Sequence, residues 1–220
     1  MMIDQPVLVP GQTLFYTLRH GLTELNRSKR TGGRLDAPLL DVGRQQAQDA
    51  RGNFDGTPID VVIASSLRRA IETAEIVTGW KREQMLIDDL AIERSFGEME
   101  GLTQDEIREK FPSVIYVPIE HVRYSLNPPG GESFETLRAR ARAFLARTLG
   151  AHRGKRVLIS SHQNFMQQLH GELRGLDPYA SLRDDIVNLE LNQFHLDADG
   201  RLIGHRVYRL CPDVSKYPSF

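Results

Sequence analysis

Residues 13–26 read TLFYTLRHGLTELN, and the stretch changes from apolar to polar partway along. TLFYTL, residues 13–18, is short, aromatic-rich and bounded by glycines, which predicts a buried β-strand. Arg19 and His20 follow directly, so a guanidinium and an imidazole stand side by side where the strand ends. Two interpretations are open at this point. The pair either begins an ordinary surface loop or forms half of an anion pocket with the histidine as nucleophile.

Short apolar runs alternate with helix-like stretches along the rest of the chain. Further strands are predicted at 60–66 and 156–161, and helices at 41–51, 67–78, 133–150 and from about Gln163. Ser133 is expected to cap the third of these helices and Gly150 to end it. A hairpin is expected around the turn at 197–200. The alternation predicts an α/β sandwich with a largely parallel sheet, which the hairpin makes mixed.

One region of the sequence is irregular. Residues 111–131 contain four prolines, which break any regular pattern. We expect a loop or small cap over the sheet there. Since there is no internal repeat, low-complexity segment or clear linker, residues 1–220 are expected to form one domain with a small cap or loop insertion at 104–130.

The composition limits the classes of partner. The chain has 220 residues, of which 40% are hydrophobic and 26% charged, as in ordinary globular proteins. A net charge of −1 offers no general basic field for nucleic acid or an anionic membrane. No apolar run approaches the roughly 20 residues that span a bilayer. The N-terminal residues MMIDQPVLVPGQ do not resemble a signal peptide and Cys211 is the single cysteine, so a cytoplasmic protein is expected.

Polar side chains follow three of the predicted strands. Arg19 and His20 follow the first, Arg69 lies just beyond the second, and His162 follows the third. Because ligands bind outside the carboxyl ends of strands in open α/β sheets, these groups are expected to converge. Guanidinium groups bind phosphate oxygens, and a neutral imidazole can attack phosphorus. With a carboxylic acid nearby to protonate the leaving group, such a set suits phosphoryl transfer.

LRHGLTELN (18–26) resembles the signature of the histidine phosphatase superfamily, the phosphoglycerate-mutase-like group. Further segments resemble those of the family, in the family's order: RLDAPLLDVGRQQA (34–47), SSLRRAIETA (65–74), AIERSFGEMEGLT (91–103), PPGGESF (128–134) and VLISSHQNF (157–165). One such motif would be weak, but this ordered set is specific. The resemblance implies a three-layer α/β/α sandwich with a mostly parallel, mixed central sheet.

The resemblance also implies roles for the site residues. His20 corresponds to the nucleophile that becomes phosphohistidine. Arg19 and Arg69 correspond to the clamp on the phosphoryl oxygens, and His162 to a hydrogen-bond donor to them. Glu93 corresponds to the residue that protonates the leaving group and then activates water. The family's chemistry needs no metal or cofactor, and the histidines here show no metal-ligand spacing.

Four further residues are predicted to contact the substrate. The resemblance places Asn26 in the same pocket, and Thr23 is predicted to bind substrate with it. Arg34 can meet a second acidic group of a substrate, although a solvated basic loop is the favoured interpretation. Gln163 and Asn164 depart from the family pattern, in which a small residue or glycines commonly follow the second histidine. Their side chains are expected to narrow the pocket or to add hydrogen-bond donors.

The predicted function is metal-independent, acid-type hydrolysis of a small phosphorylated metabolite. Mutases of the family commonly carry a glutamate where Leu22 stands here, and they have a longer cap than residues 104–129 can form. The alternatives are a cofactor-dependent phosphoglycerate mutase-type phosphomutase and a non-catalytic phospholigand-binding protein. A homodimer through the edge of the C-terminal hairpin is a further prediction.

Overall fold

A six-stranded sheet forms the centre of the protein. The computed structural model describes residues 3–211. The strands follow the order β3-β2-β6-β1-β7-β8 and are β1 (Thr13–Arg19), β2 (Val61–Ala64), β3 (Leu86–Ile87), β6 (Arg156–Ser161), β7 (Glu190–Leu196) and β8 (Leu202–Arg209). The first four of these are parallel, whereas β7 is antiparallel to β1 and to β8. The predicted mixed, mostly parallel sheet is confirmed.

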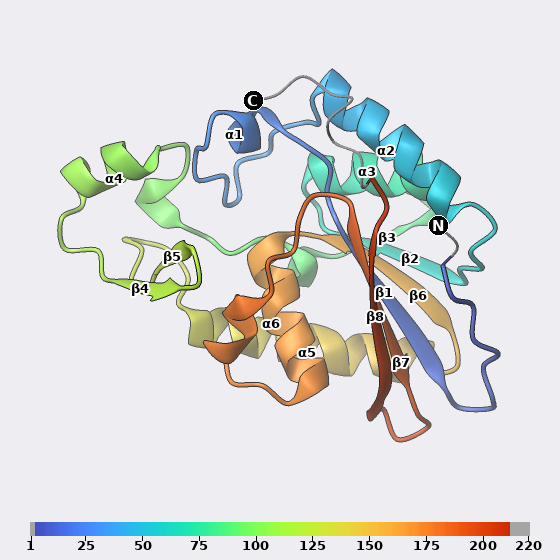
Figure 1. Ribbon diagram of the computed structural model, residues 1–220. Coiled ribbons are helices and arrows are strands. Elements are labelled where there is room, and N and C mark those ends of the chain that lie inside the picture. The colour runs from blue at the N-terminus through green and yellow to red at the C-terminus, as the bar shows by residue number, and fades with distance from the viewer. Residues whose placement is uncertain (1–2, 212–220) are drawn as a thin grey trace.

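Helices cover both faces of this sheet (Figure 1). They are α2 (Asp41–Phe54) and α3 (Arg68–Thr78) on one face, and α5 (Phe134–His152) and α6 (Gln163–Arg174) on the other. The predicted three-layer α/β/α sandwich is therefore confirmed. Ser133 caps α5 as expected, by accepting a hydrogen bond from the Thr136 N–H. Gly150 does not end the helix, which continues to His152; Gly154 instead takes the left-handed conformation, with φ of 80°.

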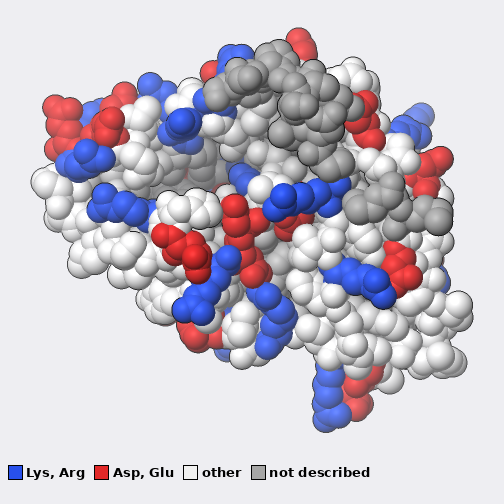
Figure 2. Space-filling view, in the orientation of Figure 1, with Lys and Arg blue, Asp and Glu red and all other residues white. Residues whose placement is uncertain are grey.

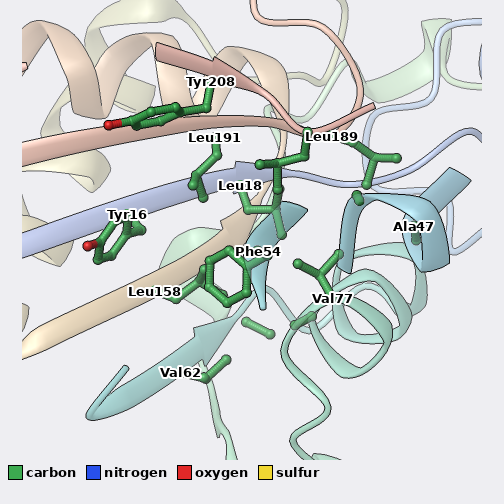
Figure 3. Packing of buried hydrophobic residues seen from close by; sticks show 14 of the residues in the cluster. Tyr16, Leu18, Ala47, Phe54, Val62, Val77, Leu158, Leu189, Leu191 and Tyr208 are labelled. Carbon is green, nitrogen blue, oxygen red and sulfur yellow. The ribbon is translucent and has the colours of Figure 1, made fainter. Parts of the chain in front are cut away.

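Alternate residues of β1 face the two helical layers. Leu14, Tyr16 and Leu18 pack in the core under α2 and α3, and Phe15 packs in the core under α5 and α6. Figure 3 shows Tyr16 and Leu18 beside the neighbouring strands and helices of the first core. Because both faces of the strand are buried, its sequence is continuously apolar and does not alternate with polar residues.

Gly43 in α2 lies against the loop that follows His20. A Cβ atom at Gly43 would lie 2.3 Å from the carbonyl oxygen of Leu22, so the helix or the loop would have to shift. We expect Gly43→Ala to lower the free energy of unfolding by about 1–3 kcal/mol in urea titrations. Gly52→Ala is the matched control, because a Cβ at that position of α2 meets nothing within 4 Å. The control is expected to raise stability by roughly 0.5–1 kcal/mol; the same loss at both positions would contradict the argument.

A small unit stands beside the sheet, near the carboxyl ends of its parallel strands (Figure 1). It consists of α4 (Gln104–Lys110) and the hairpin of β4 (Tyr116–Ile119) and β5 (Val122–Ser125), while the short helix α1 (Glu24–Arg27) lies after β1. The prediction of an irregular segment is wrong for these two strands. Pro118 is tolerated in β4 because each strand of a two-stranded hairpin has an unpaired edge.

Acidic and basic side chains are interspersed over the face that Figure 2 shows. Short 3₁₀ turns connect several elements, at Arg82–Gln84, Asp89–Ala91, Gly97–Met99 and Ala180–Arg183. None of the helices among residues 3–211 combines the length and the apolar character that crossing a bilayer would require.

Candidate active site

The carboxyl ends of β1, β2 and β6 meet at one edge because these strands are parallel neighbours. His20 follows β1 and His162 follows β6, and the centroids of their rings lie 5.1 Å apart. Arg69 lies in the first turn of α3, which begins shortly after β2. The expected convergence of these three strand ends is therefore observed.

A cavity of about 210 Å³ opens at this edge of the sheet. Its lining includes four of the predicted catalytic residues, Arg19, His20, Arg69 and Glu93. The lining also includes apolar side chains, from Leu25, Phe96, Met99, Tyr116, Val122 and Tyr124. Pockets for drug-sized ligands commonly have volumes of about 300–1,000 Å³. The smaller volume of this cavity therefore fits a smaller molecule.

The imidazole of His20 is held in one tautomer. Its Nδ1 lies 2.7 Å from the carbonyl oxygen of Gly21, and a carbonyl can only accept, so Nδ1 carries the proton. The lone pair is therefore on Nε2. Burial lowers the pKa of His20 well below its usual value, and the positive charges of Arg69 and Arg19 lower it further. A neutral imidazole with a free lone pair on Nε2 is the form that can attack an electrophile.

Arg69 is buried and Arg19 half-buried, and backbone carbonyl groups fix both. Arg19 donates through Nη1 to the carbonyl of Ile186, and its buried Nε has no partner among the described residues. Arg69 donates through Nη1 and Nη2 to the carbonyls of Leu35 and Gly33, at 2.6 and 2.7 Å. Burial lowers the pKa of each guanidinium, and the Glu93 carboxylate opposes that shift. The two positively charged guanidinium groups lie next to His20.

Both ring nitrogens of His162 are engaged within the protein. Arg69 Nε–H donates to its Nδ1 over 3.2 Å, so Nε2 carries the proton and donates to Ser65 Oγ over 2.8 Å. Burial and the nearby Arg69 lower the pKa of His162 well below its usual value. In this arrangement His162 orients Arg69. A hydrogen bond from His162 to a phosphoryl oxygen requires it to release one of these contacts.

Three backbone N–H groups hold the carboxylate of Glu93, two of them at the start of α6. Oε1 accepts from the main-chain N–H of Arg94 and of Phe165, at 2.8 and 3.1 Å, and Oε2 accepts from that of Asn164 at 3.3 Å. A helix N-terminus stabilises negative charge in this way. The carboxyl group is thereby fixed beside the cavity that His20 also lines.

A cluster of charged side chains holds the main chain at Glu93 from the other side. Arg140 on α5 donates through Nη2 to the Glu93 carbonyl at 3.2 Å and to the Glu132 carboxylate at 2.7 Å. Arg34 reaches the same two groups through Nε and Nη2, both at 3.3 Å. This cluster fixes the position of Glu93 and places Arg34 with it. Arg34 is not among the described residues that line the cavity.

The other predicted substrate-binding residues, Thr23, Asn26 and Gln163, do line the cavity. Thr23 donates from both its main-chain N–H and its hydroxyl to Asn26 Oδ1, at 3.2 and 3.0 Å. The Asn26 amide nitrogen is consequently the end of that side chain left to donate to a ligand.

The loop before β7 contributes to the site, which sequence reasoning missed. Asn188 donates through Nδ2 to the carbonyl of His20 at 2.7 Å, and the Ile186 carbonyl accepts from Arg19. Residues 186–196 precede the expected hairpin turn and are largely apolar, which is typical of one strand, but Leu189 has a φ of 59° and β7 begins only at Glu190. A left-handed residue in an apolar run leaves no signal in the sequence.

Possible metal ligands do not gather in this region. Across the part of the chain that the structure describes, no three side chains of histidine, cysteine, aspartate or glutamate are grouped so as to hold a metal ion.

Known proteins share this sequence pattern and fold. A model of the histidine phosphatase superfamily (branch 1) matches residues 15–207. Phosphoglycerate mutase-like protein 4 of Arabidopsis thaliana is 33% identical over 81% of this chain and 77% of its own length. The uncharacterized phosphatase PhoE of Bacillus subtilis is 30% identical over 73% of this chain and 77% of its own. The structure of a putative alpha-ribazole-5'-P phosphatase from Escherichia coli superimposes with a TM-score of 0.79 at 22% identity, covering 90% of this chain and 96% of that one.

Proposed function

The chain belongs to the histidine phosphatase superfamily, and we propose that it hydrolyses small phosphomonoesters through a phosphohistidine formed on His20. The observation that carries this proposal is the neutral imidazole of His20, fixed with Nε2 unprotonated beside Arg19 and Arg69. The small cavity volume and the phosphatase name of the Bacillus subtilis relative support it.

The first step forms the phosphoenzyme. His20 Nε2 attacks phosphorus, the bond from phosphorus to the ester oxygen breaks, and the carboxylic acid of Glu93 gives its proton to the departing alkoxide. Arg19 and Arg69 donate to the non-bridging oxygens, where negative charge is spread in the transition state. Their preorganised positions lower the barrier because little rearrangement is needed during the reaction.

The second step releases phosphate. The Glu93 carboxylate takes a proton from water, the water oxygen bonds to phosphorus, and the bond from phosphorus to Nε2 of His20 breaks. The imidazole returns to its starting tautomer because Gly21 still accepts from Nδ1. Neither step calls for a metal or cofactor in this proposal.

Hydrolysis requires that water reaches the phosphohistidine, and two features of the chain favour it over mutase chemistry. The unit beside the cavity is small, a short α4 and a two-stranded hairpin between Gln104 and Ser125. Leu22, directly after the His20-Gly21 pair, adds no carboxylate near the nucleophile. A mutase, in contrast, must exclude water while its intermediate turns over.

The test is phosphate release from phenyl phosphate in H₂¹⁸O with excess chelator. Turnover with one ¹⁸O in each released phosphate is expected. Label from a ³²P-labelled ester is expected to stay on the protein in alkali and to leave it in acid, as a phosphohistidine does. Transfer of the phosphoryl group to a second alcohol without ¹⁸O would support a mutase. Tight phosphate binding without turnover would support a binding module and contradict the proposal.

The pKa of His20 makes a prediction for activity at acidic pH. Because burial and the two arginines lower that pKa, the imidazole is neutral below pH 6.5 and only protonates at a more acidic pH. For a histidine of ordinary pKa, the fraction of imidazole in the neutral, reactive form would fall about tenfold at pH 5.5. We therefore expect kcat/KM, corrected for substrate ionisation, not to fall between pH 7 and pH 5.5. NMR titration of the His20 ring is the direct measurement, and a midpoint at or above 6.5 would contradict the prediction.

The single Cys211 supports our proposal of a reducing, cytoplasmic location.

The exposed strand β8 at the sheet edge is the surface proposed for a homodimer, which sedimentation analysis would detect.

A further inference from the structure

Both polar groups of the peptide unit between His20 and Gly21 are hydrogen-bonded to side chains. The His20 carbonyl accepts from Asn188 Nδ2 at 2.7 Å, and the Gly21 N–H donates to Thr73 Oγ1 at 2.9 Å. The carbonyl and the N–H of a trans peptide point in opposite directions. Two side chains, one from the loop before β7 and one from α3, therefore hold this peptide unit from opposite sides.

Asn188 is oriented by the groups that it contacts. Its Nδ2 lies 2.7 Å from the His20 carbonyl oxygen and 3.4 Å from that of Gly21, so the nitrogen end of the amide faces the nucleophile loop. The next residue, Leu189, has a φ of 59° and donates its N–H to the Arg19 carbonyl at 3.1 Å. The loop before β7 therefore binds two successive carbonyl groups at the end of β1.

Thr73 holds the other side of the peptide unit from the second turn of α3. Its side chain is buried, and its hydroxyl donates to the Arg69 carbonyl at 2.6 Å. Because the single hydroxyl proton is used there, the oxygen serves as the acceptor for the Gly21 N–H. Neither Thr73 nor Asn188 is among the described residues that line the cavity. Both side chains therefore act on the site through the nucleophile loop.

Gly21 supplies the acceptor that fixes the imidazole of His20, over 2.7 Å from Nδ1. A Cβ at this position would lie 3.2 Å from the Gly43 carbonyl oxygen, so the close approach of α2 favours glycine. Glycine has the widest freedom in φ and ψ, and the place of its carbonyl depends on these torsions. The restraint that a side chain would give is absent at Gly21, and hydrogen bonds on the preceding peptide unit can replace it.

We propose that Asn188 and Thr73 are positioning residues, which fix the peptide unit between His20 and Gly21 and so keep the imidazole proton on Nδ1. If this unit rotates, the Gly21 carbonyl moves away from Nδ1 and the proton can occupy Nε2 instead. That tautomer has no lone pair on Nε2. The expected effect on turnover rests on the proposed function, in which Nε2 attacks phosphorus, whereas the tautomer itself is a property of the protein alone.

The experiment measures the tautomer of neutral His20 from the ¹⁵N chemical shifts of its ring, in the parent and in Asn188→Leu and Thr73→Val. The His20 signals are assigned by their loss in His20→Ala. Each substitution keeps the approximate size of the side chain and removes its hydrogen bond to the peptide unit. The ratio of the Nδ1–H to the Nε2–H form is expected to fall about tenfold in each variant, as for the loss of one hydrogen bond.

Turnover of phenyl phosphate provides the second measurement on the same variants. We expect kcat to fall about tenfold, because less of the imidazole has its lone pair on Nε2. The affinity for inorganic phosphate in calorimetry is expected to be retained, since Arg19 and Arg69 keep their backbone partners. A merely structural role for Asn188 and Thr73 would lower stability and leave the tautomer of the folded protein unchanged.

Thr78→Val is the matched control, because Thr78 lies on the same helix and has the bonding pattern of Thr73. Its hydroxyl donates to the Ala74 carbonyl at 2.7 Å and accepts from the Trp80 N–H at 3.1 Å. This variant is expected to keep the parent's tautomer and kcat. Thr73→Ser retains the hydroxyl and is expected to keep the parent's tautomer. If Asn188→Leu fails to fold, the comparison of valine with serine at position 73 still decides the outcome.

The two measurements separate this inference from the proposed function. A tautomer shift in both variants of a protein that hydrolyses no phosphomonoester would reject the proposed function and support the positioning role. An unchanged tautomer in Asn188→Leu and Thr73→Val would overturn the positioning role, whatever the parent catalyses. A shift of the same size in Thr78→Val would also overturn it, because that hydroxyl does not contact the nucleophile loop.

Discussion

His20→Ala is expected to lower kcat/KM for phosphomonoester hydrolysis by at least about 10⁴-fold. The substitution removes the Nε2 lone pair that forms the bond to phosphorus, while the other members of the site keep their partners. Arg19 stays bonded to the Ile186 carbonyl and Arg69 to His162. Phosphate binding is therefore expected to survive the loss of turnover. Phosphate release from phenyl phosphate and calorimetry with inorganic phosphate measure the two effects.

His152→Ala provides the histidine control. His152 ends α5 and is not among the described residues that line the cavity, so its replacement is expected to leave turnover unchanged. The labelled phosphoenzyme must also be absent from His20→Ala and present in the control. Persistence of the label in His20→Ala would contradict the assignment of His20 as the nucleophile.

The sequence was most informative where a segment's own pattern determines its structure. The apolar runs at 13–18 and 156–161 became β1 and β6, because strands buried on both faces need continuous apolar sequence. Ser133 was correctly predicted to cap α5. Hairpin β4–β5 was not predicted, since its strands are short and Tyr124 in β5 bonds to Gln167 and to the Leu182 carbonyl, which lie far along the chain.

The strand ends predicted which site residues would meet, but not what each one contacts. His20, Arg69 and His162 converge because β1, β2 and β6 are parallel neighbours, a property of topology. That His162 uses both ring nitrogens on Arg69 and Ser65 depends on side-chain geometry, which spacing along the chain does not reveal. Arg34 illustrates the same limit, since its partners lie about 60 and 100 residues further on.

The Glu93 carboxyl is fixed beside the cavity, and its replacement in Glu93→Gln is expected to have the second large effect. This variant cannot protonate the leaving group, so kcat/KM for an alkyl phosphate is expected to fall by about 10²–10⁴-fold. A nitrophenolate leaves without a proton, so formation of the phosphoenzyme from 4-nitrophenyl phosphate is expected to be much less affected. The amide also cannot activate water, and the phosphohistidine should then accumulate. Rapid mixing is expected to show a burst of nitrophenolate followed by slow turnover.

The dependence on the leaving group distinguishes a proton donor from a merely structural residue. Glu93 also accepts three backbone hydrogen bonds, one from Arg94 and two from the start of α6, and the new amide nitrogen cannot accept any of them. Damage to α6 through those lost bonds would slow alkyl and nitrophenyl esters by the same factor and give no burst. Glu132→Gln is the matched variant, because it weakens the cluster that holds the Glu93 carbonyl and leaves the Glu93 carboxyl intact. A loss that depends on the leaving group in Glu93→Gln, beside a uniform loss in Glu132→Gln, would assign the proton transfer to Glu93.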